Sequence, residues 1–343
     1  MTLPPFSGLE VDMLSLGNAD AILVTQWTGS NATRVLIDGG HAADADEVLK
    51  KLAELRVAHL HHLVCTHPHD DHAAGLVQLL NNKQLTVGQL WMHLPWTHIN
   101  YEEFKRSLGQ AEQSKVVNVI RASLDTTQEL YRVAVARNIP ISEPFDKSSI
   151  GPLFVCGPTL EFYRNLLVQF GDFERLKNFE SARAAHELKL MIEDFARGTA
   201  VGGQPLAEDD GDLGSEPTEP ENESSVILTA SHNANRLLFT ADAGVSALQS
   251  AVSRYQLNNL NWMQIPHHGS RRNLTETLVE YFKPTYAFVS ANGSTRHPRR
   301  KVVNAFKKIG TKVYSTHHPT PRSLHHSVGS VPERKGYEKA TEL

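Results

Sequence analysis

Residues 66–72 read Thr-His-Pro-His-Asp-Asp-His, and they follow a run from Leu60 to Cys65 that predicts a buried strand. Three imidazoles and one carboxylate fall within six positions: His67, His69, Asp71 and His72. Neutral imidazole and carboxylate are ligands that zinc, manganese and iron accept. A histidine-rich surface loop is the alternative, because the chain has 18 histidines in 343 residues. The His-x-His-x-Asp-His spacing directly after a strand favours a metal site.

The composition is that of a globular protein with one large domain or two modest ones. Hydrophobic residues make up 40% of the chain and charged residues 21%. The net charge of −4 is unevenly divided, because residues 264–343 carry 14 Lys+Arg against 5 Asp+Glu, or +9, and the remainder 20 against 33, or −13. A basic surface of this kind attracts anionic substrates, although beyond Thr320 a solvated basic tail is the simpler expectation.

Neither the N-terminal sequence nor the interior predicts export or membrane insertion. The first residues have no basic region followed by a continuous apolar segment, and no stretch approaches the roughly 18 apolar residues of a membrane span. Cys65 and Cys156 lie in strand-like apolar runs, where they are expected to be small buried hydrophobic residues and not a disulfide pair. The default expectation is a cytoplasmic protein with no membrane partner.

The order of predicted elements indicates a layered α/β fold with helices outside the sheet. In the first part of the chain, we expect three strands within 8–37, a helix over 43–56 and a strand over 60–65. A second helix begins at 73–80, and a short strand follows at 90–93. After the middle of the chain the pattern returns as a hairpin followed by alternating helices and strands, over 226–230, 236–240, 245–255, 262–265, 274–282, 286–290, 299–309 and 312–315.

The middle of the chain differs from both flanks. Residues 101–138 and 160–197 have few breakers and predict mainly helix, with a short strand at Phe154–Val155 between them. Residues 198–223 contain eight acidic residues and no Lys or Arg, with several Gly and Pro. This composition predicts a disordered loop, and acidic metal binding is the alternative.

Candidate ligands follow several separate apolar strands. They are Asp38, the cluster at 67–72, Asp242, His267 and His268. In open α/β sheets, functional sites gather at the carboxyl ends of strands. We therefore expect these side chains to converge, although they are about 230 positions apart at the extremes.

These motifs resemble those of the metallo-β-lactamase superfamily: an Asp after an early strand, His-x-His-x-Asp-His, a bridging Asp and a final His. The resemblance is closer to the hydrolase domain of the ComEC type from bacterial competence proteins. It is carried by LIDGG at 36–40, THPHDDH at 66–72, TADAG at 240–244, IPHHGS at 265–270 and VSANGSTRHP at 289–298. It covers roughly 9–96 and 224–318 and lacks the membrane portion of full-length competence proteins.

The resemblance implies a four-layer αββα sandwich with a mainly helical insertion. The two halves of the fold would occupy 1–98 and 224–318, with the insertion and its acidic disordered loop over 99–223 and a flexible tail over 319–343. The insertion would be an arm that binds a protein partner, or a cap over the active site.

The resemblance also implies two divalent ions, with zinc as the first expectation and manganese as the second. His67 and His69 would hold one metal, Asp71 and His72 the other, and Asp242 would bridge them. Alignment of Pro266-His267-His268-Gly269 with the family's Pro-Gly-His-Gly favours His268 as the final ligand, with His267 facing the substrate.

Two further residues have implied roles around the metals. Asp38 would orient a ligating imidazole without binding metal itself. His297, in the basic cluster Arg296-His297-Pro298-Arg299-Arg300, would contact phosphate or protonate the leaving group, and an exposed basic loop is the alternative.

One element of the superfamily pattern is missing. The histidine expected before the strand of the bridging Asp is replaced by Glu221-Asn222-Glu223-Ser224-Ser225. The first metal is thereby left with few protein ligands, so it would bind weakly, be completed by water or substrate phosphate, or be manganese. His232 could substitute, but its predicted place in a hairpin turn lies away from the strand ends.

The resemblance implies a metal-dependent phosphodiesterase or nuclease, in which hydroxide held by the metals attacks a DNA, RNA or nucleotide phosphodiester. One alternative is hydrolysis of a different bond in a lactone, thioester or β-lactam. Another is a degenerate fold that binds without catalysis, which the missing histidine suggests.

Overall fold

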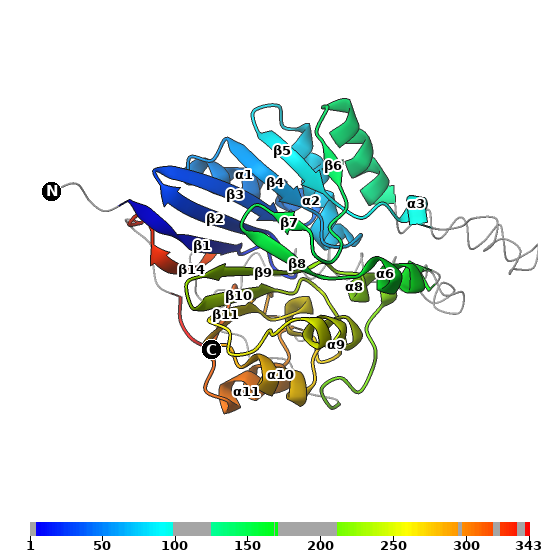
Figure 1. The fold of residues 1–343 in the computed structure, drawn as a ribbon, viewed down its shortest axis with the longest axis vertical. Coiled ribbons are helices and arrows are strands. Elements are labelled where there is room, and N and C mark those ends of the chain that lie inside the picture. The colour runs from blue at the N-terminus through cyan, green and yellow to red at the C-terminus, as the bar shows by residue number, and fades with distance from the viewer. Residues whose placement is uncertain are drawn as a thin grey trace, which may run out of the picture.

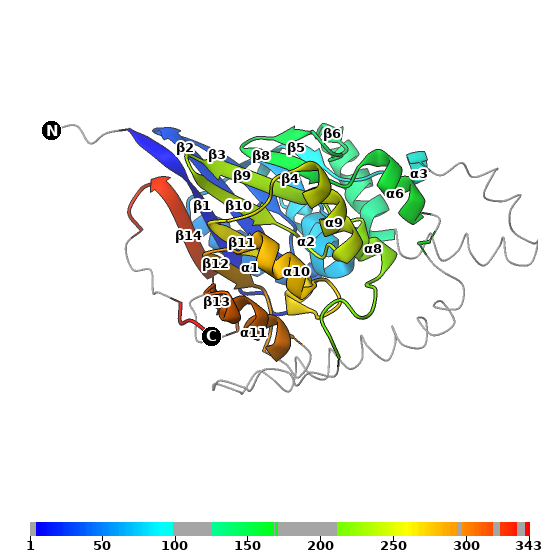
Figure 2. The same cartoon turned by 60° about the horizontal axis from the view of Figure 1, so that its bottom comes forward.

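A computed structural model of the chain describes residues 5–98, 125–167, 169–170, 211–293, 297–317, 323–334 and 340–343. Two mixed sheets of seven strands lie face to face, with helices on both outer sides (Figures 1 and 2). The α/β class and the four-layer αββα order predicted from the sequence are confirmed.

The first sheet, here called sheet A, has the strand order β14-β1-β2-β3-β4-β5-β6. Its strands are β14 (Ser323–Ser330), β1 (Phe6–Leu14), β2 (Ile22–Gly29), β3 (Asn31–Ile37), β4 (His59–Val64), β5 (Thr86–Trp91) and β6 (Ile141–Ser142). Neighbours from β14 to β3 are antiparallel, and neighbours from β3 to β6 are parallel. The carboxyl ends of β3, β4 and β5 therefore meet at one edge.

The second sheet, sheet B, repeats this design with the order β13-β12-β11-β10-β9-β8-β7. Its strands are β13 (Lys312–Ser315), β12 (Tyr286–Val289), β11 (Trp262–Gln264), β10 (Asn235–Phe239), β9 (Ile227–His232), β8 (Leu153–Gly157) and β7 (Ser149–Ile150). Strands β10 to β13 are parallel, and β9 and β10 form the predicted antiparallel hairpin.

Alternation along the strands divides their side chains between three cores. In β1, Leu9, Val11 and Met13 face the core between the two sheets, where they join Trp262 and Phe288 of sheet B. The opposite face of each sheet packs against helices, and Figure 1 shows α9, α10 and α11 on the outer side of sheet B. Because both faces of both sheets are covered, the strands contain long buried runs.

The helices lie close to their predicted positions. Outside sheet A are α1 (Ala45–Glu54), α2 (Asp70–Asn81) and the helical residues 125–136, and outside sheet B are α9 (Val245–Arg254), α10 (Glu276–Phe282) and α11 (Arg300–Lys308). Short elements complete the described fold: η1 (Ala42–Asp44), α3 (Pro95–His98), α6 (Leu160–Leu167), α8 (Pro220–Glu223) and η2 (His267–Gly269). Among the described helices, none is both long and apolar enough to cross a bilayer.

The prediction that 99–223 is one insertion is wrong in part. Residues 99–124, 168 and 171–210 lie outside the described residues, but β6 adds to sheet A, and β7 and β8 add to sheet B. The chain thus passes from one sheet to the other within the supposed insertion. These strands have two to five residues, which is too short for a clear period-2 pattern in the sequence.

Two predictions of disorder also differ from the structure. The tail expected over 319–343 contains β14, which pairs with β1 along its whole length and includes His325 and His326. Of the acidic loop expected over 198–223, residues 211–223 are described and end in α8, where Asn222 and Glu223 are buried. Both segments are polar, and their order comes from partners distant in sequence. Cys65 and Cys156 are buried free thiols, as predicted.

Candidate metal centre

The candidate ligands come from the carboxyl ends of parallel strands in both sheets. Asp38 follows β3, the cluster at 67–72 follows β4, Asp242 follows β10, and His267 and His268 follow β11. The structure brings the side chains of these four segments together, as the topology of parallel strands requires.

The local sequence explains how the 67–72 cluster is presented. Pro68 ends the extended segment, and His69 is the N-cap residue of α2 with an extended backbone. Asp71 and His72 therefore lie in the first helical turn, where negative charge is favourable and where both side chains turn towards the strand end. Gly75, one turn later, touches the backbone of Gly39, so α2 packs closely against the loop that carries Asp38.

Asp242 is the centre of the cluster. Its Oδ1 lies 3.4 Å from His72 Nε2, and its Oδ2 lies 3.9 Å from His67 Nε2 and 3.6 Å from His267 Nε2. Two groups of candidate ligand atoms share it: Asp71, His72, Asp242 and His268 form one, and His67, His69 and Asp242 form the other. One carboxylate therefore faces two adjacent sites.

Several polar atoms at this centre have no hydrogen-bond partner among the described residues. They are His67 Nε2, His72 Nε2 and both carboxylate oxygens of Asp242, all buried. A buried unpaired polar atom costs about 1–3 kcal/mol, and more if it is charged. Divalent cations would satisfy all four atoms, so the residues present fit two metal ions.

The surrounding charges shift the ionisation of these groups in opposite directions. Burial would lower the pKa of His72, but Asp242, Asp71 and Asp38 outweigh burial and hold it well above its usual value. Burial and the neighbouring His72 hold the pKa of His67 well below its usual value. Such divergence between adjacent imidazoles marks an accumulation of buried charge that is typical of functional sites.

Asp38 orients His72, in the position predicted for it. Its Oδ2 accepts a hydrogen bond from His72 Nδ1 at 2.8 Å and from the Thr66 hydroxyl at 2.7 Å, and its Oδ1 accepts from the Thr66 amide at 2.8 Å. With Nδ1 thus a donor, the Nε2 lone pair of His72 faces the centre. Asp38 adopts a φ of 59°, a left-handed conformation that Asp tolerates better than most residues.

The adjacent histidines His267 and His268 are directed differently. His268 Nδ1 donates to the Ser290 carbonyl at 2.9 Å, which leaves Nε2 3.4 Å from Asp71 Oδ2. His267 Nδ1 lies 3.0 Å from Asn273 Oδ1. Of the two, the structure groups His268 with the other candidate ligands of the second site.

Asp20 is a buried residue beside the candidate centre that the sequence analysis did not identify as a site residue. It is buried, accepts a hydrogen bond from the Ser290 hydroxyl, and accepts another from Gln264 Nε2 at 2.9 Å. Since Ser290 holds His268, Asp20 positions that imidazole indirectly. The sequence shows Asp20 only as the end of a Gly-Asn-Ala-Asp turn, with no spacing that relates it to a residue 270 positions away.

Two other histidines differ in how near they lie to the candidate centre. The ring of His297 lies 5.8 Å from that of His267 and 6.3 Å from that of His268, so it borders the centre. His232 ends β9 and lies beside Gly329 of β14, which places it away from the strand ends that carry the ligands.

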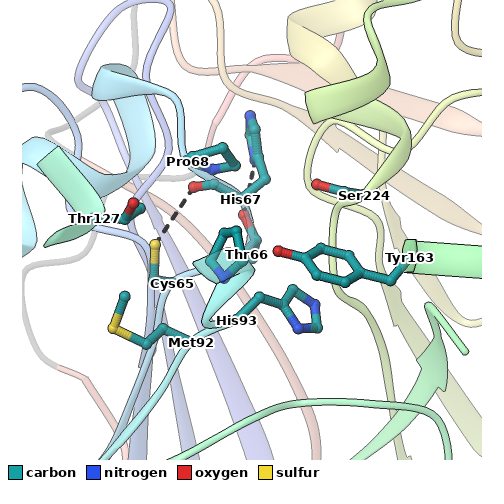
Figure 3. A pocket seen from close by; sticks show the side chains of 10 residues that line it. Cys65, Thr66, His67, Pro68, Met92, His93, Thr127, Tyr163 and Ser224 are labelled. Atoms are coloured by element: carbon teal, nitrogen blue, oxygen red, sulfur yellow. Dashed lines mark hydrogen bonds between the residues drawn. The ribbon is translucent and has the colours of Figure 1, made fainter. Parts of the chain in front are cut away.

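The place of the missing histidine is filled by small side chains beside a pocket. Ser224 and Ser225 are buried, and Figure 3 shows Ser224 across from His67, with the Tyr163 hydroxyl pointing towards Thr66. His93, at the end of β5, lines the same pocket between the rings of Tyr163 and other aromatic residues, and burial lowers its pKa to about 3. Among the described residues, the first site therefore groups two histidines, His67 and His69, with Asp242.

A third group of candidate ligands lies beside the first site. His69 Nε2 is 3.6 Å from Glu219 Oε2. Together with Glu221, these residues offer ligand atoms that lie within 4.8 Å of one another. Both glutamates belong to the acidic segment that the sequence predicts to be disordered.

Comparisons with known proteins agree with the fold. The family model described as the metallo-beta-lactamase superfamily matches residues 14–293. Exodeoxyribonuclease YycJ from Bacillus anthracis is 32% identical over 80 residues, which are 23% of this chain and 29% of that protein. The match thus spans less than a third of the length of that relative.

Among solved structures, the metallo-beta-lactamase fold protein YhfI from Bacillus subtilis is 8% identical with a TM-score of 0.44, over 94% of this chain and 100% of that one. A diphosphatase of the PhnP family is 9% identical with a TM-score of 0.39, over 94% of this chain and 99% of that one.

Proposed function

Because the chain belongs to the metallo-β-lactamase superfamily, a family whose model spans most of it, we propose that it is a two-metal phosphodiesterase of the ComEC type, acting on a nucleic acid or nucleotide. The single observation that carries this proposal is Asp242, whose two buried, unpaired oxygens face His72 and His67 respectively. A carboxylate in this position would offer one oxygen to each of two cations, as a two-metal hydrolase needs.

The proposal assigns the ligands as follows. The first metal is held by His67, His69 and Asp242, and the second by Asp71, His72, Asp242 and His268. Asp38 and Asp20 keep two of the imidazoles in the tautomer that directs Nε2 to the centre. When bound, two divalent ions would supply an acidified water and charge stabilisation for a phosphoryl group.

Two histidines at the border of the centre, His267 and His297, would accept and donate protons during the reaction. Asn273 Nδ2 donates to the Asp242 carbonyl at 2.8 Å, so its Oδ1 is left to accept from His267 Nδ1. The lone pair of His267 Nε2 then faces Asp242 and the reacting region. His297 is therefore the better placed to hold a proton for the leaving oxygen, and His267 to accept one.

Phosphodiester substrates agree with the charge of the chain and with one of its relatives. Residues 264–343, which contain His267, His268 and His297, carry a charge of +9, which favours an anionic substrate. The curated relative from Bacillus anthracis is named an exodeoxyribonuclease, which supports a nucleic acid as the first substrate to test.

Substitution of a proposed ligand tests this function. We expect Asp71→Ala to lower the hydrolysis of single-stranded DNA or bis-p-nitrophenyl phosphate by more than about 100-fold, because losing a ligand costs at least as much as losing an outer-shell partner. The assay would supply Mn²⁺ and Zn²⁺ in turn, with duplex DNA, RNA, cyclic nucleotides, a lactone and a β-lactam as further substrates.

Asp70→Ala is the matched control. Asp70 precedes Asp71 in the same helical turn, but its carboxylate is exposed and accepts a hydrogen bond from Thr126. Undiminished phosphodiester turnover by Asp71→Ala would contradict the proposal. Turnover of only the lactone or the β-lactam by the unaltered protein would point to a different bond.

A further inference from the structure

The acidic segment 211–223, here called the acidic strap, is held against the candidate metal centre at several points. Glu216 pairs with Arg271 at 3.0 Å and with Arg272 at 2.9 Å, immediately after the His267-His268 loop. Glu223 is largely buried and accepts a hydrogen bond from the Ala247 amide at 2.7 Å, at the start of α9. The strap between these anchors contains Glu219 and Glu221.

The anchors place two carboxylates beside the ligand of the first site that is most exposed. Glu219 Oε2 is 3.6 Å from His69 Nε2, and His69, Glu219 and Glu221 offer ligand atoms within 4.8 Å of one another. The side chains of His69 and Glu219 are 27% and 41% exposed, so the Glu219 carboxylate can move by a rotamer change without repacking a core.

A second observation shows that this side of the centre lacks a partner. His67 Nε2 is buried without a hydrogen bond among the described residues, and it belongs with His69 and Asp242 to the first site. Those three residues leave a coordination position to be filled, because a tetrahedral site uses four ligands, and the fourth can be a water or a further side chain. The small Ser224 and Ser225 stand where the superfamily's third histidine is expected, and Ser225 Oγ is also buried and unpaired.

The distance between ligand atoms of one metal limits which side chain can complete the first site. Two ligand atoms at about 2.1 Å from one metal lie roughly 3.0–3.5 Å apart, depending on geometry. The 3.6 Å separation of His69 Nε2 and Glu219 Oε2 is close to this range. Glu219 is grouped with His69 and Glu221 and not with His67 or Asp242, so its exposed carboxylate has to turn towards His67 to complete the first site.

We propose that Glu219, assisted by Glu221, supplies the missing protein ligand of the first metal, in the role that the superfamily gives to a histidine. This inference rests on the proposed two-metal function. With Glu219, the first site would consist of two imidazoles and at least two carboxylates, in place of the superfamily's three histidines. Such an oxygen-rich set suits Mn²⁺ better than a three-histidine set does.

Metal stoichiometry tests the inference without relying on activity. The full chain and its Glu219→Gln/Glu221→Gln variant would be stripped with chelator, dialysed against Mn²⁺ or Zn²⁺ and assayed for bound metal, with affinities from calorimetry. We expect two equivalents of Mn²⁺ for the unaltered protein. The variant should retain about one tight equivalent, with the affinity of the other lowered at least tenfold, the lower limit for loss of even an outer-shell partner.

Two matched variants sharpen the result. Glu54→Gln/Glu280→Gln removes two exposed carboxylates from α1 and α10 and should bind metal like the unaltered protein. Glu216→Gln loosens the strap without touching the proposed ligands and should weaken only the first site. Far-ultraviolet circular dichroism of each variant checks that the fold is retained.

The outcomes separate this inference from the proposed function. Two equivalents of unchanged affinity in the Glu219→Gln/Glu221→Gln variant would overturn the inference and leave the two-metal function intact. Loss of the first metal in His267→Asn, with the double glutamine variant unaffected, would overturn it in favour of His267. Less than one equivalent in the unaltered protein with either metal would overturn the proposed function and the inference with it.

Discussion

Two imidazoles at the candidate centre, those of His72 and His268, are each held by a carboxylate that is not a candidate ligand. Asp38 holds His72 from the side of sheet A, and Asp20 holds His268 through Ser290 from the side of sheet B. Asp20 also accepts from Gln264, so both of its oxygens face donors. The direction of the ligating nitrogens is therefore set by a second layer of buried carboxylates.

Replacing Asp20 by Asn tests this arrangement. The Asn side chain must turn its amide nitrogen towards either Ser290 or Gln264, both of which are donors to Asp20. We expect the affinity for the second metal to fall by about 10–100-fold, measured by calorimetry, with a smaller change in substrate KM than in kcat. Asp46→Asn, an exposed substitution on α1, is the control, and equal metal affinities for the two variants would argue against a positioning role.

Among the secondary-structure elements, β14 shows how a polar strand is fixed at the edge of a sheet. Arg334, just after β14, makes hydrogen bonds of 2.6 and 2.8 Å to the fully buried Asp12 of β1 and one of 2.9 Å to Glu10. His325 of β14 adds a contact of 3.2 Å to Asp12. Burial opposes ionisation of Asp12, but His325 and Arg334 outweigh it and hold its pKa below the usual value.

Substitution of Arg334 by Ala should leave Asp12 buried and without its guanidinium partner, although its contact with His325 remains. We expect the free energy of unfolding at pH 7 to fall by about 3 kcal/mol, measured by urea denaturation. In the unaltered protein, the contribution of Asp12 is present above a pH of about 3.9 and is lost as pH falls through its lower folded-state pKa. In the variant, Asp12 can take up a proton more readily, so the difference between the two proteins should shrink as pH falls towards 4.

The double variant Asp12→Asn/Arg334→Ala separates charge from packing. It removes the buried carboxylate together with its partner, so it should recover part of the lost stability. No recovery would indicate that Arg334 acts through the packing of its side chain and not through the ion pair.

At the scale of the whole molecule, the candidate centre joins the two sheets. His67 and His72 come from the sheet A side, and Asp242 and His268 come from the sheet B side. Buried atoms on both sides lack hydrogen-bond partners among the described residues, and a cation between the two sides would supply them with one. Metal binding is therefore expected to stabilise the contact between the two halves of the fold.

Removal of metal should lower the thermal stability accordingly. At a free metal concentration of about 100 times Kd, binding adds about 2.7 kcal/mol, which corresponds to a Tm higher by roughly 4 °C for a chain of this size. Differential scanning fluorimetry in EDTA and after addition of Mn²⁺ would measure this shift. Asp242→Asn should not respond to Mn²⁺, and a Tm of the unaltered protein that is independent of metal would contradict the expectation.

How much of this could be predicted depends on how local each signal is. The cluster at 67–72, Asp38, Asp242 and the pair His267-His268 each follow a strand with clear hydrophobic periodicity, so the sequence alone indicated the layered α/β fold and the residues that converge. The strands β6 and β7 were missed because they have two residues each, which is too few for a period to be counted, whereas β8 was expected over Phe154–Val155 and extends from Leu153 to Gly157.

Long-range partners decided the rest. Asp20 and Ser290 lie 270 positions apart, β14 is ordered by Asp12 and Glu10 of β1, and the acidic strap is held by Arg271, Arg272 and the start of α9. Composition indicates only how a segment interacts with water. These segments were predicted to be solvated because their carboxylates and histidines have no partner nearby in the sequence. Only the tertiary structure brings opposite charges and open backbone amides to them, and it thereby turns an expected disordered loop into a candidate source of metal ligands.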